Sequence, residues 1–160
     1  MRNTFESAQL KPVIMKNISF FTTSLLMLSS AMAQKVPPGT IVGVWISEDK
    51  NLKIEIYKAG PQYFAKQIWG TFLFETDGRT PKKDINNSLE RLRKRDLNNL
   101  IILRNLDYDR VIYVGGLLYD YKTGKTFNSH IKLNGENILK LRVYGTLSLF
   151  GRTTIWTRVQ

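Results

Sequence analysis

The sequence predicts an all-β fold: eight antiparallel strands in an up-and-down barrel, with one long loop and a short helix between the third and fourth strands. Runs rich in β-branched and aromatic residues recur at short spacing, and turn-forming residues separate them. The final run, residues 151–159, alternates such residues with others and contains no proline. Because barrel closure removes both sheet edges, we expect this run to pair with the first one, residues 43–48.

The composition leaves room for one folded domain and narrows its chemistry. Of 160 residues, 42% are hydrophobic and 11% aromatic, which is enough for a real core. The absence of cysteine excludes disulfides and thiolate metal sites, and the single histidine, His130, excludes a multi-histidine site. We therefore predict no metal and no cofactor. The formal net charge of +11 favours an anionic partner: nucleic acid, a membrane surface or an acidic ligand.

Residues 15–33 have the pattern of a secretory signal peptide. Lys16 gives a positive start, residues 18–28 form a short apolar run, and Ala31 and Ala33 make a small-residue cleavage site. The apolar run is shorter than the roughly 20 residues that a membrane-spanning helix needs. We expect cleavage after Ala33 and export, so that the mature chain is periplasmic or secreted.

The signal peptide divides the rest of the chain. Residues 1–14 precede it without contributing to its pattern, and we interpret them as an extension from a mis-called start codon. Residues 34–160 then form a single barrel domain. Export separates this domain from nucleic acid, so we expect its anionic partner to be a small ligand, an envelope polyanion or a membrane surface. The oligomeric state stays open.

Three strands open the domain, at residues 43–48, 52–58 and 62–69. In the second, Leu52, Ile54 and Ile56 alternate with more polar residues, which is typical of a half-buried strand. Sequences rich in Asp, Asn, Gly and Pro separate the three runs and predict short turns.

Residues 70–98 form the predicted long loop. Within it, Ser88 is placed to cap a short helix over residues 89–97. That helix carries four basic residues: Arg91, Arg93, Lys94 and Arg95. They are candidates for contact with an anionic surface, although a solvated face over one mouth of the barrel is the more common reason for such a charge run.

Five further strands complete the count. Gly124 predicts a tight turn, and Gly115 with Gly116 predicts a bulge within a curved strand. Asp107, Tyr108 and Asp109 predict a turn. The five strands are expected at residues 99–104, 110–119, 125–133, 138–144 and 151–159.

Several short motifs carry a family resemblance. They are Gly43-x-Trp45, Tyr119-Asp120 with Gly124-Lys125-Thr126-Phe127, Arg142-x-Tyr144-Gly145, and Leu149-x-Gly151-Arg152-Thr153-x-x-Trp156-Thr157-Arg158. Together they resemble domain-of-unknown-function family 2147 (DUF2147), small exported bacterial proteins, over about residues 41–159. Arg95-Asp96 departs from the Arg-Pro expected there. The resemblance implies an envelope location and a lipocalin-like barrel, and it implies no established activity.

The Gly-x-Trp opening with a late arginine also resembles the lipocalin and calycin signature, in which an indole plugs one barrel end beneath a guanidinium. A cation over an indole is independently favourable, by roughly 0.5–2 kcal/mol. We therefore assign barrel closure to Gly43, Trp45, Trp156 and Arg158.

Alternation along the last two strands does not show which of their two faces points into the barrel. One face of the last strand carries Arg152, Thr154, Trp156 and Arg158, and the other carries Thr153, Ile155 and Thr157. On the strand before it, Lys140, Arg142 and Tyr144 share a face opposite that of Leu139, Leu141 and Val143. If the cationic faces point inward, Arg142, Tyr144 and Arg152 are candidate ligand-binding residues; if they point outward, the interior is an ordinary apolar core.

The sequence contains no recognisable catalytic constellation. His130 alternates with polar Asn128 and Lys132, which predicts a surface histidine, and Ser129 points to the opposite face. The leading hypothesis is a non-catalytic, lipocalin-like exported protein that binds a small amphipathic or anionic molecule such as a lipid or fatty acid. The alternative is a structural or interaction module with a packed core that acts through its basic surface.

Overall fold

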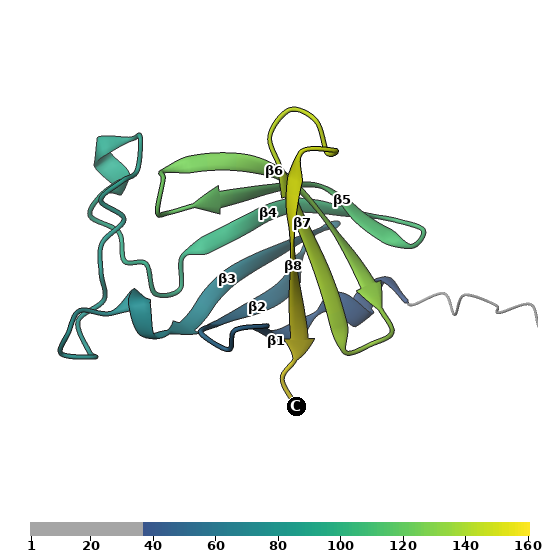
Figure 1. Ribbon diagram of the computed structural model, residues 1–160, viewed down its shortest axis with the longest axis horizontal. Coiled ribbons are helices and arrows are strands. Elements are labelled where there is room, and N and C mark those ends of the chain that lie inside the picture. The colour runs from purple at the N-terminus through teal and green to yellow at the C-terminus, as the bar shows by residue number, and fades with distance from the viewer. Residues whose placement is uncertain (1–36) are drawn as a thin grey trace, which may run out of the picture. The chain divides into compact units, whose positions relative to one another are not determined.

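A computed structural model describes residues 37–160, which form a closed barrel of eight antiparallel strands (Figure 1). The predicted signal peptide and the preceding extension lie outside the described residues. Each strand pairs with the next, and the last pairs with the first, so the predicted up-and-down barrel is confirmed. The strands are β1 (Gly43–Ser47), β2 (Leu52–Ala59), β3 (Gln62–Gly70), β4 (Ile101–Asp109), β5 (Ile112–Asp120), β6 (Lys125–Asn134), β7 (Ile138–Tyr144) and β8 (Gly151–Arg158).

The register at the seam between β1 and β8 sets the closed end of the barrel. Trp45 lies opposite Arg158, and Ser47 lies opposite Trp156. A 3-10 turn, η1 (Pro38–Ile41), leads into β1 and buries Ile41 completely. The fully buried Trp45 donates its indole N–H to the carbonyl of Ile41, at 2.8 Å. The lead-in and the indole thus close this end together.

Arg158 holds the closed end by stacking and by hydrogen bonds. Its guanidinium lies 4.3 Å from the centre of the Trp45 ring. It also donates to the carbonyls of Glu136, Val42 and Thr40. A Cβ atom at Gly43 would lie only 2.6 Å from the guanidinium, and the φ of +136° at this residue is one that L side chains rarely adopt. Glycine at this position therefore makes room for the arginine over the indole.

The β4–β5 hairpin differs from the sequence prediction. Asp107 and Asp109 belong to β4, which runs without a break from residue 101, and the prediction of a turn there is wrong. The turn comes later, at Arg110, which has φ +58°. Both carboxylates lie on the exposed side of the strand, where they keep their hydration and do not oppose strand pairing. In β5, the register shift between Tyr113 and Gly116 confirms the predicted bulge.

The predicted helix over residues 89–97 is also wrong. The segment between β3 and β4 contains two 3-10 turns, η2 (Thr71–Leu73) and η3 (Glu90–Leu92), and no α-helix. Ser88 caps nothing; instead the Leu89 amide donates to Asn87 Oδ1, at 2.9 Å. Leu89 is half exposed while Leu97 is buried, so the two leucines do not share one apolar face. No helix among the described residues is long and apolar enough to cross a membrane.

A buried carboxylate organises this long segment instead. Asp84 is 1% exposed and accepts hydrogen bonds from Tyr119 Oη at 2.7 Å and from Asn87 Nδ2 at 2.8 Å. Arg95 forms an ion pair with it at 2.8 Å and lies 5.1 Å from the Tyr119 ring centre. Nearby, the backbone of Asn86 approaches so closely that a Cβ atom at Gly124 would overlap it. The segment is therefore fastened to β5 and to the β5–β6 turn.

We predict that Arg158→Ala lowers the free energy of unfolding by about 1–3 kcal/mol, because the stacking over Trp45 is lost and three carbonyls lose a donor. The free energy of unfolding of Arg158→Lys should lie between those of the natural protein and Arg158→Ala, because an ammonium group cannot reach all three carbonyls. Chemical denaturation followed by tryptophan fluorescence measures both. The control is Arg152→Ala on the same strand, for which we expect a change within about 0.5 kcal/mol. Equal effects at the two arginines would contradict the closing role of Arg158.

We also predict that Asp84→Ala loosens the long segment without unfolding the barrel. Tyr119, Asn87 and Arg95 would then lose their shared acceptor, which costs about 1–3 kcal/mol. Limited trypsin digestion within residues 91–95 should accelerate about tenfold or more. Asp96→Ala is the matched control, because Asp96 pairs with Lys83 where both side chains are about half exposed. Unchanged digestion of the Asp84 variant would refute this anchoring.

Candidate functional site

The end of the barrel opposite Trp45 is hollow. It contains a cavity of about 1160 Å³ that opens between the β1–β2 turn, the β5–β6 turn and the β7–β8 loop. This volume is at or above the upper end of the roughly 300–1,000 Å³ typical of small-molecule sites. An eight-stranded barrel is wide enough to enclose one small ligand. The cavity is therefore the candidate functional site.

Apolar side chains form most of the cavity wall, because strand alternation turns every second residue inward. They come from β2, β4, β5, β6, β7 and β8, and from η2. The apolar residues on the wall include Leu52, Ile54, Phe72, Ile102, Leu103, Leu118, Phe127, Leu141, Val143 and Trp156. In the closed half, buried side chains fill the same interior: Trp45, Ile56, Tyr63, Leu106, Tyr113, Ile131 and Leu139.

The sequence left open whether β7 and β8 turn their cationic or their apolar faces inward, and in the structure each strand does something different. Leu141 lies opposite Thr154, and Val143 lies opposite Arg152. Cross-strand partners in an antiparallel pair share a face, so the apolar face of β7 points inward together with the cationic face of β8. β7 thus contributes its complete apolar set and β8 its complete cationic set, and the cavity is an apolar wall with one arginine near its rim.

Arg142 lies on the outside of the barrel and does not line the cavity, contrary to the inward alternative, whereas Tyr144 lies at the cavity rim with its ring turned to the outer face. Arg142 donates from Nε and Nη2 to the Ser148 carbonyl, at 2.8 and 2.6 Å, and so holds the β7–β8 loop. The Tyr144 ring lies 5.7 Å from the His130 ring on the outer face. Partial burial and the nearby Arg142 lower the pKa of His130.

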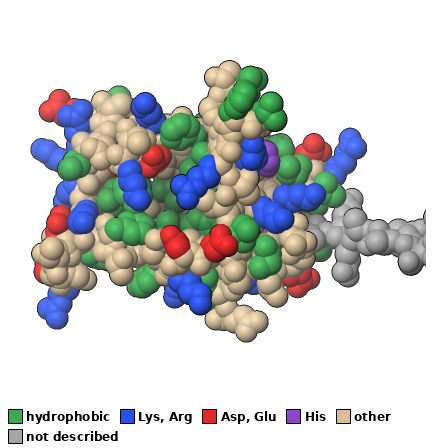
Figure 2. All heavy atoms as spheres, in the orientation of Figure 1, with side chains coloured by type: hydrophobic (Ala, Val, Ile, Leu, Met, Phe, Trp, Pro, Cys, Tyr) green, Lys and Arg blue, Asp and Glu red, His purple; other side chains and the backbone are tan. Residues whose placement is uncertain are grey.

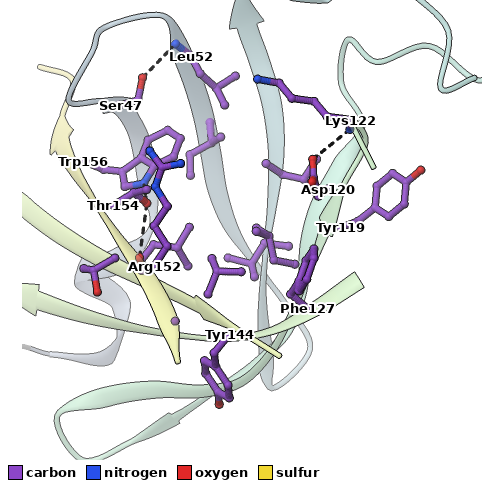
Figure 3. Close-up of a pocket in the computed structure, with 18 of the residues that line it drawn as sticks. Ser47, Leu52, Tyr119, Asp120, Lys122, Phe127, Tyr144, Arg152, Thr154 and Trp156 are labelled. Carbon is purple, nitrogen blue, oxygen red and sulfur yellow. Dashed lines mark hydrogen bonds between the residues drawn. The ribbon is translucent and has the colours of Figure 1, made fainter. Parts of the chain in front are cut away.

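Arg152 is the candidate cation of the site. It lines the cavity on the same wall as Thr154 and Trp156 (Figure 3). The Trp156 indole N–H donates to Thr154 Oγ1 at 3.0 Å, so those two polar groups satisfy each other. Within residues 37–160, the Arg152 guanidinium has neither a hydrogen bond nor an ion pair. Its capacity to donate is therefore available to an acceptor in the cavity.

Gln67 adds a deep polar group that sequence reasoning missed. It is fully buried on β3, and its Nε2 donates to the Leu97 carbonyl at 2.5 Å. Gln67 belongs to the lining of the cavity, and its Oε1 is buried without a hydrogen-bond partner in the described residues. A buried acceptor without a partner is costly unless water or a ligand donates to it. Its position among the inward residues of β3 is the one signal that could have revealed it.

Aromatic and charged groups surround the mouth. Phe72 stacks on Tyr121, with ring centres 6.0 Å apart, and Lys122 lies over Phe72. Burial, followed by the charge of Asp120, raises the pKa of Tyr121 to about 12. This phenol therefore stays protonated near neutral pH. Hydrogen bonding with Ser47 lowers the pKa of Asp49.

The four basic residues predicted for an anionic surface do not form one face. Arg95 pairs with Asp84, and Arg93 Nε donates to the Asn87 carbonyl at 2.8 Å. Arg91 and Lys94 are exposed. Two of the four cations thus hold the long segment together, and two remain on its surface.

No group of three His, Asp or Glu side chains in residues 37–160 is arranged to hold a metal ion.

Comparisons with known proteins agree with this architecture. The family described as "Uncharacterized protein conserved in bacteria (DUF2147)" matches residues 43–158. A search of curated proteins finds no match. Among solved structures, protein HP1028 from Helicobacter pylori, described as belonging to the lipocalin family, is similar with a TM-score of 0.65 and 24% identity. The alignment covers 74% of this chain and 82% of that protein.

At 24% sequence identity the structural similarity establishes the fold alone, and the fold is lipocalin-like. The family match covers most of the chain, from the glycine that opens β1 to the arginine that ends β8. This chain belongs to the DUF2147 family.

Proposed function

We propose that this protein is exported and binds one small amphipathic molecule with an acidic head group, such as a fatty acid, in the open half of its barrel. The observation that carries the proposal is a large, mainly apolar cavity with an unpaired arginine on its wall. The proposed role is binding rather than catalysis. Export is supported by the signal-peptide pattern of residues 15–33.

The apolar wall favours a hydrocarbon chain as the part of the ligand that enters. Leu118, Phe127 and Leu141 lie below the mouth, and Trp156 contributes the edge of a large apolar ring. Each methylene that moves from water to such a wall contributes about 0.8 kcal/mol.

The polar end of such a ligand fits beside Arg152. A guanidinium recognises a carboxylate or phosphate through two parallel hydrogen bonds. Glu48, Asp49 and Asp120 line the same cavity, and none of them forms an ion pair with Arg152 in the described residues. Asp120 accepts from the Lys122 amide and the Thr123 hydroxyl, and Asp49 accepts from Asn51. They therefore leave the Arg152 charge without a direct partner.

The alternative, an interaction module with a packed core, suits one half of the barrel. Its closed half is filled by buried aromatic and aliphatic side chains. The open half is not filled, and that difference favours ligand binding.

We predict that a long-chain fatty acid raises the melting temperature of the delipidated protein, because ligands that bind only the folded state stabilise it. Arg152→Gln should weaken binding of the acid about tenfold, because one charge-assisted contact is lost. Binding of the fatty alcohol of equal length should be unchanged by that variant. Isothermal titration measures both ligands. Equal weakening of acid and alcohol would contradict the head-group role, and absence of binding for both would contradict the proposed function.

We also predict that Val143→Trp abolishes binding of both ligands by filling the open half. Val143 lines the cavity opposite Arg152 and is half-buried, so the barrel should stay folded around the larger ring. Val111→Trp is the control, since Val111 is 60% exposed at the β4–β5 turn. Titration and thermal melting report binding and folding separately. Full binding by a folded Val143→Trp protein would place the ligand elsewhere.

A further inference from the structure

The β7–β8 loop presents a compact group of exposed hydrophobic side chains. Leu147, Leu149 and Phe150 are 61%, 78% and 77% exposed, and they fall within four consecutive residues. Figure 2 shows hydrophobic side chains gathered at this tip, at the top of the view. Single exposed apolar residues are ordinary, but a group of them at one tip indicates a surface that meets an apolar partner.

The structure holds this loop in place and bonds four of its backbone carbonyls. Arg142 donates to the carbonyls of Ser148 and Leu149. Asn128 Nδ2 donates to the carbonyl of Gly145 at 2.8 Å, and the Phe150 amide closes the turn on Leu147 at 3.2 Å. Polar backbone groups that are already bonded lose little when a loop enters an apolar phase. The loop is thus arranged with its polar groups toward the barrel and its side chains outward.

The strands next to the loop carry an unbalanced positive charge. β6, β7 and β8 contain no Asp or Glu, and their outer face carries Lys132, Lys140 and Arg142. Two further cations of these strands lie elsewhere, because Arg152 faces the cavity and Arg158 stacks on Trp45. Lys132 lies directly opposite Lys140, and neither makes an ion pair in the described residues. Like charges in this position weaken strand pairing. An anionic surface beside them would reverse that cost.

We propose that the β7–β8 loop inserts into the interface of an anionic lipid bilayer, with the basic outer face of β6–β8 lying against the lipid phosphates. Binding to an anionic membrane requires an apolar group that inserts and a cationic surface beside it, and the loop and the outer face of β6–β8 supply these two features. A second copy of the chain fits less well, because a two-fold contact at this loop would bring two basic faces together. Leu149 and Phe150 also line the cavity. Docking therefore brings the mouth to the bilayer, and passage of a ligand between the two rests on the proposed function.

Vesicle co-sedimentation tests the docking. Purified protein should bind vesicles of phosphatidylcholine with phosphatidylglycerol far more tightly than vesicles of phosphatidylcholine alone, and added salt should weaken binding. Replacing Leu147, Leu149 and Phe150 together by Ser should lower affinity at least about tenfold. Lys132→Gln and Lys140→Gln should each lower it about fivefold. The matched control replaces Ile85 and Val111 by Ser, which are 69% and 60% exposed on other turns.

A site-specific label tests where the protein touches the lipid. The natural chain has no cysteine, so Phe150→Cys provides one attachment point for an environment-sensitive dye. Its emission should shift to the blue on anionic vesicles, and the same dye at Val111→Cys should not shift. This readout does not depend on the folding of the triple serine variant.

Each outcome decides the proposal. Equal binding to neutral and anionic vesicles, undiminished binding by the serine variant, or no shift at position 150 would overturn it. Dimers in sedimentation equilibrium that the serine variant abolishes, without vesicle binding, would assign the loop to self-association instead. Arg152→Gln and Val143→Trp should still bind vesicles. If the unmodified protein binds anionic vesicles but no fatty acid, the proposed function alone is rejected. If it binds fatty acid but no vesicles, docking alone is rejected.

Discussion

Closure of the sheet at the β1–β8 seam is the constraint on which the rest of the barrel depends. The seam pairs the two ends of the domain, and Arg158 adds contacts to Glu136 beyond β6 and to the lead-in before β1. A hydrogen-bonded guanidinium on a buried indole resists slippage of register, because a shift of one residue would turn Trp45 outward. Gly43 is part of the same arrangement, since a side chain there would occupy the place of the guanidinium.

This strongly closed end has a consequence for the opposite one. Trp45, Tyr63 and Tyr113 fill the interior near the lead-in, with the two tyrosine rings packed edge to face at 5.3 Å. The core beneath the cavity is therefore complete without a ligand. Stability rests in the closed half, and the open half is free to stay hollow and to line its wall with smaller residues such as Val143.

Three arginines of similar sequence context have three different roles. Arg158 closes the barrel, Arg142 holds the β7–β8 loop from outside, and Arg152 faces the cavity without a partner. The long segment before β4 uses Arg95 in yet another way, as the counter-charge of buried Asp84. What an arginine does in this fold thus depends on which carbonyls, rings and carboxylates the topology places within its reach.

Hydrophobic alternation and turn residues were sufficient to predict the strand number, the closure and the pairing of the last strand with the first, because these depend on local pattern and on edge removal. The Trp45 and Arg158 positions also followed from a short motif. The helix at 89–97 could not be excluded locally, since Asp84 and Tyr119, which hold that segment otherwise, are distant in sequence. Nor could parity alone assign the faces of Arg142 and Arg152, because either face of a strand satisfies the same alternation. Only the register between β7 and β8, imposed by closure of the whole sheet, decided which arginine meets the cavity.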